Sequence, residues 1–325
     1  MPGQTGLGEF ELIAELFAPL SAEAPGAFGL TDDAATIPVP PGHQLVMTKD
    51  MMVAGVHFRP QDPPALVARK LLRVNLSDLA GMGASPYGYA LGLSLSPDQD
   101  DDWLRAFAAG LAEDQRTYGV VLLGGDTTST PGPLTLSLTA FGLTPTGRIL
   151  RRNGARPGEA VCVSGTIGDA ALGLLALNGE LDDPTGFLAD RYLLPRPRVA
   201  LGPLLPGCAS AGLDISDGLA ADIGHLSRAS AVGVVLEMDA IPLSDAARAQ
   251  LERRPDLGEL VLSGGDDYEI AFTIPPERLA PLLEQAAQLG IPVTRIGTVT
   301  EGQGVRVLDA AGTPVVLHQT GYRHR

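Results

Sequence analysis

One pattern recurs along this chain: an apolar run, then a small or glycine-rich turn, then aspartate. It occurs in residues 45–50, 121–126, 213–218 and 261–267, and a weaker version ends at Asp32 and Asp33. Short apolar runs that stop at glycine or aspartate are typical of buried strands. The pattern therefore predicts a mixed α and β protein in which carboxylates gather where strands end.

Carboxylate oxygens are the ligands that hard cations such as Mg2+ prefer, whereas zinc and copper favour the imidazole and thiolate groups that these turns largely lack. Two carboxylates about 4 Å apart repel by roughly 4 kcal/mol at an effective dielectric near 20. A converging group of aspartates therefore needs a cation or bound protons. Each aspartate taken singly could instead cap a helix or occupy an ordinary turn. Sequence spacing does not show that they converge.

A helix is expected from about Pro63 to Gly81 or Gly83, and Leu71, Asn75 and Asp78 share one of its faces. Either Asn75 and Asp78 contribute to a metal site, or they are a hydrogen-bonded core asparagine and a surface aspartate. Apolar spacing and capping residues predict further helices over residues 8–17, 98–119, 169–178, 217–231 and 277–289. Strands are expected over residues 44–47, 89–96, 120–123, 134–141, 160–164, 260–262 and 270–274, with a hairpin over 305–317.

Turn-forming residues are dense between 144 and 158, which predicts a boundary between two domains. We expect an N-terminal α/β domain over residues 1–147 and a C-terminal α/β domain over 148–325. A length of 325 residues is comfortable for two such domains.

Composition excludes several classes of protein. The formal net charge of −15, with 38 acidic against 23 basic residues, disfavours nucleic-acid binding. Two cysteines favour a reducing compartment, and the first basic residue, Lys49, comes too late for a signal peptide. The longest uncharged stretch, residues 127–147, holds three prolines, so no membrane-spanning helix is expected. We expect a soluble, cytoplasmic protein that binds neither nucleic acid nor membrane.

The common nucleotide and hydrolase motifs are absent: no P-loop, no Gly-x-Gly-x-x-Gly fingerprint, no Gly-x-Ser-x-Gly elbow and no His-Glu-x-x-His helix. Seven other segments, in their order and spacing, resemble the thiamine-monophosphate kinase family over essentially the whole chain. These segments are residues 8–10, 32–35, 55–58, 74–80, 124–128, 214–219 and 264–269. The resemblance implies a two-domain aminoimidazole ribonucleotide synthetase-like fold, in which the N-terminal domain carries the dimerisation surface and the ATP and magnesium site. It also implies a homodimer in which N-terminal strands of both subunits form a shared barrel.

The resemblance further implies that the γ-phosphoryl group of ATP is transferred to thiamine monophosphate, which gives ADP and thiamine diphosphate in the final step of thiamine diphosphate biosynthesis. In-line transfer between two anions mainly needs positioning and charge neutralisation, which several Mg2+ ions can supply. No covalent enzyme intermediate and no general base are expected.

Residue by residue, the family motifs imply three sets of contacts. The magnesium shell comprises Asp33, Thr48, Lys49, Asp50, Asp78, Asp126, Asp214 and Asp217. The ATP contacts are Gly125, Asp126, Arg152 and Ser216. The contacts to thiamine monophosphate are His57, Asp266 and Tyr322.

Three residues depart from the family pattern. Thr31 stands where glycine usually precedes the first acidic pair, and Lys49 stands where threonine or serine is common, so Lys49 could bind a metal only through its carbonyl. Asp266 replaces a glutamate, and its shorter side chain predicts weakened or water-mediated contact with the substrate.

Three other activities stay open. An aminoimidazole ribonucleotide synthetase is chemically possible, although the motifs fit it less well. A cation- or nucleotide-sensing module would bind without turnover. A magnesium-dependent phosphatase would release inorganic phosphate without needing ATP.

Overall fold

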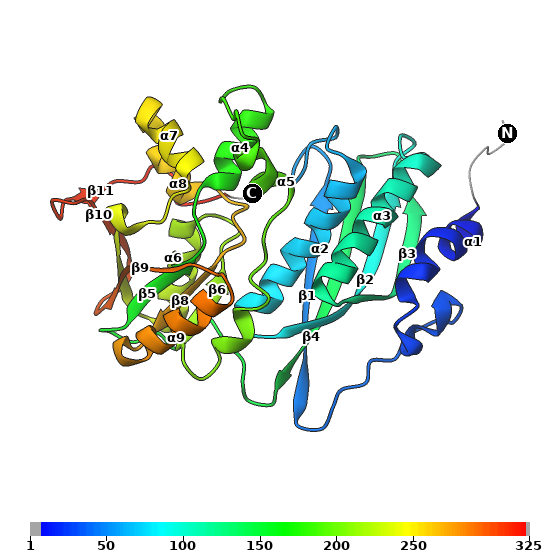
Figure 1. Ribbon diagram of the computed structural model, residues 1–325, viewed down its shortest axis with the longest axis horizontal. Helices are drawn as coiled ribbons and strands as arrows, with labels where there is room; N and C mark the ends of the chain where they lie inside the picture. The colour runs from blue at the N-terminus through cyan, green and yellow to red at the C-terminus, as the bar shows by residue number, and fades with distance from the viewer. Residues whose placement is uncertain (1–7, 323–325) are drawn as a thin grey trace. The chain divides into compact units, whose positions relative to one another are not determined.

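The computed structural model describes residues 8–322, and the chain divides into two compact units (Figure 1). The first unit comprises the chain up to Leu79 together with Ser85–Thr146, and the second comprises Ala80–Ala84 together with the chain from Gly147 onward. Residues 80–84, which lie inside the expected N-terminal domain, thus group with the second unit. Each unit combines helices with a sheet of its own.

The first unit holds a four-stranded sheet in the order β1-β4-β2-β3. Its strands are β1 (His43–Val53), β2 (Ser85–Leu95), β3 (Val121–Ser129) and β4 (Thr135–Pro145). Strand β4 pairs antiparallel with β1 and β2, and β2 pairs parallel with β3. Helices α2 (Pro64–Gly81) and α3 (Asp101–Tyr118) cover one face of this sheet (Figure 1). Helix α3 begins after the capping carboxylate of Asp100 and ends at Gly119, close to its predicted bounds.

Strands β1 and β3 continue past the aspartates at which the sequence pattern predicted them to end. Asp50 of β1 pairs with Leu138 of β4, and Asp126 of β3 pairs with Gly92 of β2, so both aspartates lie within strands. Hydrogen bonds between strands do not depend on side-chain polarity, which is why apolar runs alone gave strands that were too short. The prediction that carboxylates follow the strands is wrong for Asp50 and Asp126.

The predicted helix over residues 8–17 is also divided. Helix α1 (Glu9–Leu12) is followed by a π-helical turn, Ile13–Phe17, and then by 3-10 turns, Ala18–Ser21 and Pro25–Leu30. Pro19 and Pro25 lack the N–H that a continuing α-helix would need, so the chain beyond Phe17 forms 3-10 turns instead.

The second unit holds a seven-stranded mixed sheet in the order β11-β10-β7-β9-β5-β8-β6. Its strands are β5 (Ala160–Ser164), β6 (Ala211–Asp214), β7 (Gly233–Glu237), β8 (Ile270–Ile274), β9 (Val293–Thr300), β10 (Gly304–Leu308) and β11 (Pro314–Val315). Its helices are α4 (Asp169–Leu177), α5 (Phe187–Leu193), α6 (Leu219–Ser230), α7 (Asp245–Arg253), α8 (Gly258–Ser263) and α9 (Pro276–Gln288).

Both faces of the second sheet are buried. Val161 and Val163 of β5 pack into one apolar cluster with residues of α4 and α6, whereas Ala160 and Cys162 pack into another with α9. The predicted hairpin near Gly312 is confirmed by the antiparallel pair β10 and β11. The strand expected over residues 260–262 is wrong, because this short apolar run forms helix α8, and periodicity does not separate the two over so few residues.

Candidate functional site

In the first unit, strand β1 and helix α2 bring together Thr48, Asp50 and Asp78. The Thr48 hydroxyl donates a hydrogen bond to the Asp78 carboxylate. The Asn75 amide oxygen accepts the Asp50 backbone N–H at 3.2 Å, and its NH2 group donates to the Leu71 carbonyl at 2.9 Å. Asn75 is therefore a fully buried residue that joins α2 to β1. Burial and then the nearby charge of Asp78 raise the pKa of Asp50 to about 7.

Lys49 lies between Thr48 and Asp50 on the strand, so its side chain is on the opposite face of the sheet. There its exposed amine donates a hydrogen bond to the Ser137 hydroxyl at 2.6 Å. The Lys49 amine is thus separated by the sheet from the Thr48 and Asp50 side chains.

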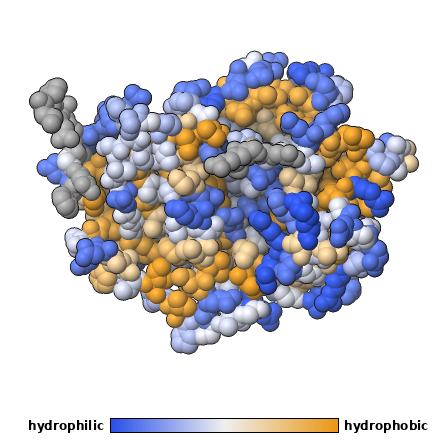
Figure 2. Space-filling view, turned by 180° about the vertical axis from the view of Figure 1, so that it is seen from behind, coloured by the Kyte–Doolittle hydropathy of each residue, from blue (hydrophilic) through white to orange (hydrophobic). Residues whose placement is uncertain are grey.

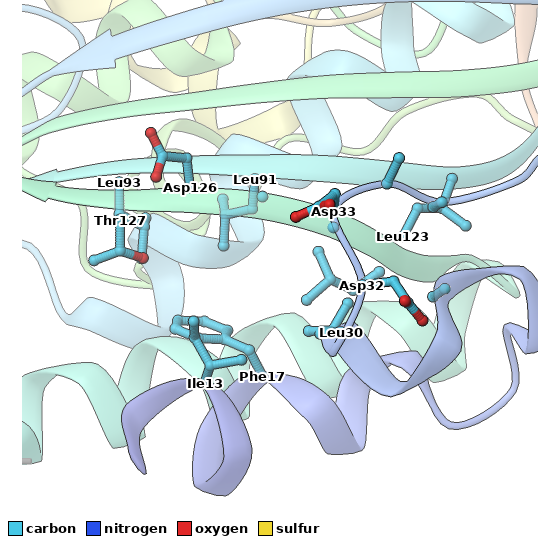
Figure 3. Close-up of a pocket in the computed structure, with 16 residues that line it drawn as sticks. Ile13, Phe17, Leu30, Asp32, Asp33, Leu91, Leu93, Leu123, Asp126 and Thr127 are labelled. Carbon is cyan, nitrogen blue, oxygen red and sulfur yellow. The ribbon is translucent and has the colours of Figure 1, made fainter. Parts of the chain in front are cut away.

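A pocket of about 160 Å³ in the same unit is lined by Asp32, Asp33 and Asp126 together with Gly124 and Gly125 (Figure 3). Figure 3 shows the Asp126 carboxylate pointing away from Ile13 and Phe17, whereas neighbouring Thr127 points toward them. The Asp32 carboxylate points away from Asp126 in the same view. The pocket therefore joins an acidic rim to an apolar wall.

The register places Asp50 and Asp126 on opposite faces of the sheet. Residues that pair across neighbouring strands point to the same face of a sheet, and successive residues of one strand point to opposite faces. Asp126 pairs with Gly92 of β2, Gly92 with Ser137 of β4, and Ser137 with Met51 of β1. Asp126 therefore shares a face with Met51, and Asp50, the residue before Met51, lies on the other face. Three strand spacings of about 4.8 Å put the two strands roughly 14 Å apart. The predicted magnesium residues of the first unit thus form two groups: Thr48, Asp50 and Asp78 in one, and Asp33 and Asp126 in the other.

Gly124 and Gly125 serve different purposes in β3. A Cβ atom on Gly125 would lie 2.1 Å from the Leu91 carbonyl oxygen, so glycine is required there for β3 to approach β2. A Cβ atom on Gly124 would meet nothing within 4 Å. Packing therefore explains Gly125 but not Gly124.

In the second unit, Asp214 ends strand β6 as the sequence predicted, and a tight turn carries Ser216 and Asp217 into helix α6. Gly218 has a φ of +123°, and a Cβ atom there would lie 2.8 Å from the Ser263 backbone. Only glycine is suited to such a crowded left-handed position. Asp214 is buried, whereas Ser216 and Asp217 are half-buried.

The loop 264–269 is bonded directly to this turn. The Asp266 N–H donates to the Ser216 carbonyl at 2.9 Å, and the Tyr268 N–H donates to the Ile215 carbonyl at 2.8 Å. The φ of Asp266 is +72°, a conformation that aspartate tolerates better than most residues. Its carboxylate accepts a hydrogen bond from the Tyr268 hydroxyl at 3.0 Å.

The C-terminal segment reaches the same turn. The Tyr322 N–H donates to the Asp217 carbonyl at 2.9 Å, and the Tyr322 side chain is 51% exposed. The second unit therefore places two predicted site residues of the turn, Ser216 and Asp217, beside two predicted substrate contacts, Asp266 and Tyr322.

Arg152 and His57 are the remaining predicted contacts. Arg152 is exposed and belongs to the second unit, where the Ser230 hydroxyl donates to its carbonyl at 3.0 Å. The pKa of His225 is lowered by burial, then by Arg228 and by Arg152, so the Arg152 guanidinium lies near helix α6. His57 belongs to the first unit, and its Nδ1 accepts the Val53 N–H at 3.1 Å at the end of β1.

Two residues of helix α6 were missed by sequence reasoning. Asp217, Asp222 and His225 each offer a ligand atom, and these atoms lie within 4.8 Å of one another. The signal was present in the sequence, because Asp222 and His225 are separated by three positions and so share a helix face.

Comparisons with known proteins agree with this two-unit architecture. The AIR synthase related N-terminal domain model matches residues 31–144, and the corresponding C-terminal domain model matches residues 156–310. The fold and the matched domains thus define a member of the AIR synthase related proteins.

Within that class, relatives that match nearly the whole chain carry the same name. A thiamine-monophosphate kinase of Caulobacter vibrioides is 45% identical over 319 residues, which cover 97% of this chain and 90% of the relative. That of Escherichia coli K12 is 40% identical over 322 residues and 98% of each chain. The solved structure of AaThiL complexed with AMPPCP and TMP has a TM-score of 0.78 and 32% identity, over 98% of this chain and 97% of that one. The chain belongs to the thiamine-monophosphate kinase family.

Proposed function

We propose that this protein is a kinase that transfers the γ-phosphoryl group of ATP to thiamine monophosphate and so forms thiamine diphosphate, the last step of its biosynthesis. The observation that carries the proposal is the turn of the second unit. There Ser216 and Asp217, implied to meet ATP and metal, are hydrogen-bonded through their carbonyls to Asp266 and Tyr322, implied to meet the substrate. Support from outside the chain comes from relatives that are named for this activity.

Magnesium fits the residues that are present. Asp50 and Asp78 are close enough for the charge of Asp78 to raise the pKa of Asp50, and the Thr48 hydroxyl is bonded to Asp78. Two carboxylates and a hydroxyl form a hard-oxygen donor set. Asp33 with Asp126, and Asp214 with Asp217, offer further carboxylates. Bound Mg2+ would neutralise phosphate charge between two anionic reactants.

The chain's own residues would bind and orient the reactants. The pocket beside Asp126 has exposed backbone at Gly125 that would bind phosphate oxygens. The exposed Arg152 guanidinium of the second unit would also pair with phosphate oxygens. His57, Asp266 and Tyr322 would hold thiamine monophosphate. No side chain needs to accept a phosphoryl group for this reaction.

We further propose a homodimer formed through the open face of the first sheet. Leu45, Met47 and Met51 of β1 lie on this face with exposed fractions of 39%, 65% and 54%. Large apolar side chains in one exposed row are typical of an interface.

No described helix is long and apolar enough to span a membrane. Cys162 and Cys208 are both free thiols, which supports a cytoplasmic location.

The decisive experiment measures ADP release from ATP with thiamine monophosphate and Mg2+, with each component omitted in turn, and identifies the product by mass spectrometry. We expect ADP and thiamine diphosphate only in the complete mixture. Release of inorganic phosphate without ATP would identify a phosphatase, and binding without any turnover would identify a sensing module. ATP-dependent formation of aminoimidazole ribonucleotide instead of thiamine diphosphate would identify a synthetase.

A further inference from the structure

Asp222, in the first turn of helix α6, binds the turn that precedes its own helix. One oxygen of its carboxylate accepts three successive backbone N–H groups, those of Ser216 at 3.1 Å, Asp217 at 3.0 Å and Gly218 at 3.2 Å. The residue is 4% exposed. Successive N–H groups that converge in this way form a concavity that binds anions.

In many nucleotide-binding proteins such a concavity receives a phosphate. Here the internal carboxylate of Asp222 already occupies it, so these three N–H groups are not available to an incoming nucleotide. The turn must therefore meet a nucleotide through its side chains. The Ser216 hydroxyl and the Asp217 carboxylate are the half-buried groups that it offers.

The other side of the turn is blocked by backbone. A Cβ atom on Gly265 would lie 2.3 Å from the Ser216 carbonyl oxygen, and one on Gly218 would lie 2.8 Å from the Ser263 backbone. The loop 263–266 therefore packs against the turn, while Asp222 holds it from within the helix. The turn has one well-determined conformation because both sides are fixed.

We propose that Asp222 is a positioning residue of the kinase: by binding the N–H groups of residues 216–218, it aims Ser216 and Asp217 at the metal-bound nucleotide. This inference rests on the proposed roles of Ser216 and Asp217. Asp222 itself touches neither substrate nor the transferred group. A single carboxylate oxygen of Asp222 is the shared acceptor of all three N–H groups, so the residue holds the three positions of the turn together.

The test is the variant Asp222→Asn, in which an amide group replaces the carboxyl group that accepts the three N–H groups. We expect it to fold, and to bind AMPPCP in the presence of Mg2+ about tenfold more weakly in calorimetry. The half-saturating Mg2+ concentration for turnover should rise by a similar factor. In wild-type protein, hydrogen exchange at the amides of 216–218 should be slow, and Asp222→Asn should accelerate it.

Asp169→Asn is the matched control, because Asp169 is an equally buried carboxylate of the same unit, bonded to the Ser244 and Thr166 hydroxyls at 2.5 Å each. It should lower the unfolding temperature and leave the AMPPCP affinity within twofold of wild type. If Asp222→Asn does not fold, Asp222→Glu replaces it. The same weakening of AMPPCP binding is expected, because the longer side chain displaces the oxygen that accepts the three N–H groups.

Wild-type AMPPCP affinity in a folded Asp222 variant, or fast exchange at 216–218 in the wild-type protein, would overturn the inference. Failure of the proposed function gives a different result. In that case wild-type protein does not turn over thiamine monophosphate, while the exchange measurement and the Mg2+ and AMPPCP titrations still decide the role of Asp222.

Discussion

Asp78 on helix α2 lies close enough to Asp50 on strand β1 for its charge to act on that carboxyl group. Burial and, after it, the charge of Asp78 raise the pKa of Asp50 from 3.8 to about 7. Between these values the folded metal-free protein holds a proton that the unfolded chain has released. The contribution of Asp50 to stability therefore falls as the pH rises through this window, and levels off above about pH 7. A cation bound by Asp50 and Asp78 would offset their charges and so remove this loss of stability.

Replacing Asp50 by asparagine should therefore stabilise the metal-free protein at pH 8 while it weakens the response to magnesium. We expect a gain of about 1 kcal/mol in the free energy of unfolding without Mg2+, and therefore an unfolding temperature about 3 °C above wild type. In proteins of 150–250 residues, 1 kcal/mol of unfolding free energy shifts the unfolding temperature by roughly 2–4 °C. At pH 5 the difference should shrink. Thermal unfolding at both pH values, with and without Mg2+, measures the effect. A less stable variant at pH 8, or one with the full Mg2+ response, would contradict this assignment.

Asp126→Asn should reduce turnover at least tenfold, which corresponds to about 1.4 kcal/mol of activation free energy. Asp126 is exposed on β3, so the fold should not change. The turnover number at saturating ATP and thiamine monophosphate, measured beside thermal unfolding, tests this. Asp102→Asn, an exposed carboxylate in the first turn of α3, is the control and should keep normal turnover. A wild-type rate in Asp126→Asn would remove Asp126 from the site.

The two glycines of β3 allow packing to be separated from ligand binding. Gly125→Ala should destabilise the protein by about 1–3 kcal/mol, because the new Cβ atom would lie 2.1 Å from the Leu91 carbonyl oxygen. Gly124→Ala should change the free energy of unfolding by less than about 1 kcal/mol, since nothing lies within 4 Å of its Cβ position. Urea unfolding compares the two. Equal free energies of unfolding for the two variants would show that the close approach of Gly125 to Leu91 does not determine the stability of the protein.

The sequence predicted the mixed α and β class and most helices, because apolar spacing and capping residues are local signals. Helix α3 between Asp100 and Gly119 is one example. It did not predict which face of the sheet each aspartate occupies, since that depends on where strands start and how they pair. Asp50 and Asp126 were expected to converge, yet the register of β1 through β4 and β2 to β3 places them on opposite faces.

Site residues that lie close together in the sequence could be predicted more readily than those that only the fold brings together. The turn from Asp214 to Gly218 could be recognised because its chemistry lies within five positions. The spacing of Asp222 and His225 indicates a shared helix face, but the hydrogen bonds of Asp222 to the backbone depend on the folded turn, and side-chain type alone does not reveal them. The contact of Tyr322 with Asp217 joins positions more than a hundred residues apart, and only the family resemblance pointed to it.

Glu269 holds two arginines inside the second unit and should be essential to stability. Its side chain is fully buried and accepts hydrogen bonds from Arg191 at 2.9 Å and from Arg198 at 2.5 Å. Glu269→Gln removes the charge that both guanidinium groups contact, and the Asp169 carboxylate, 3.8 Å from Arg191, is too far away to replace it, so we expect a loss of about 3–5 kcal/mol in the free energy of unfolding. Glu284→Gln on the exposed face of α9 should change it by less than about 0.5 kcal/mol. Similar urea midpoints for the two variants would rule out this role for Glu269.

Asp266→Glu should lower the KM for thiamine monophosphate, by about threefold, if the shorter side chain of Asp266 holds the substrate weakly. The backbone at Asp266 is fixed by its N–H bond to Ser216, so an added methylene would extend the carboxylate beyond its present reach. Glutamate adopts a φ of +72° less readily than aspartate, and part of the gain would therefore be lost to backbone strain. Asp266→Asn keeps the size and loses the charge, and its KM should rise. Steady-state kinetics with ATP saturating measures all three proteins, and an unchanged or higher KM in Asp266→Glu would mean that Asp266 is already long enough for its substrate.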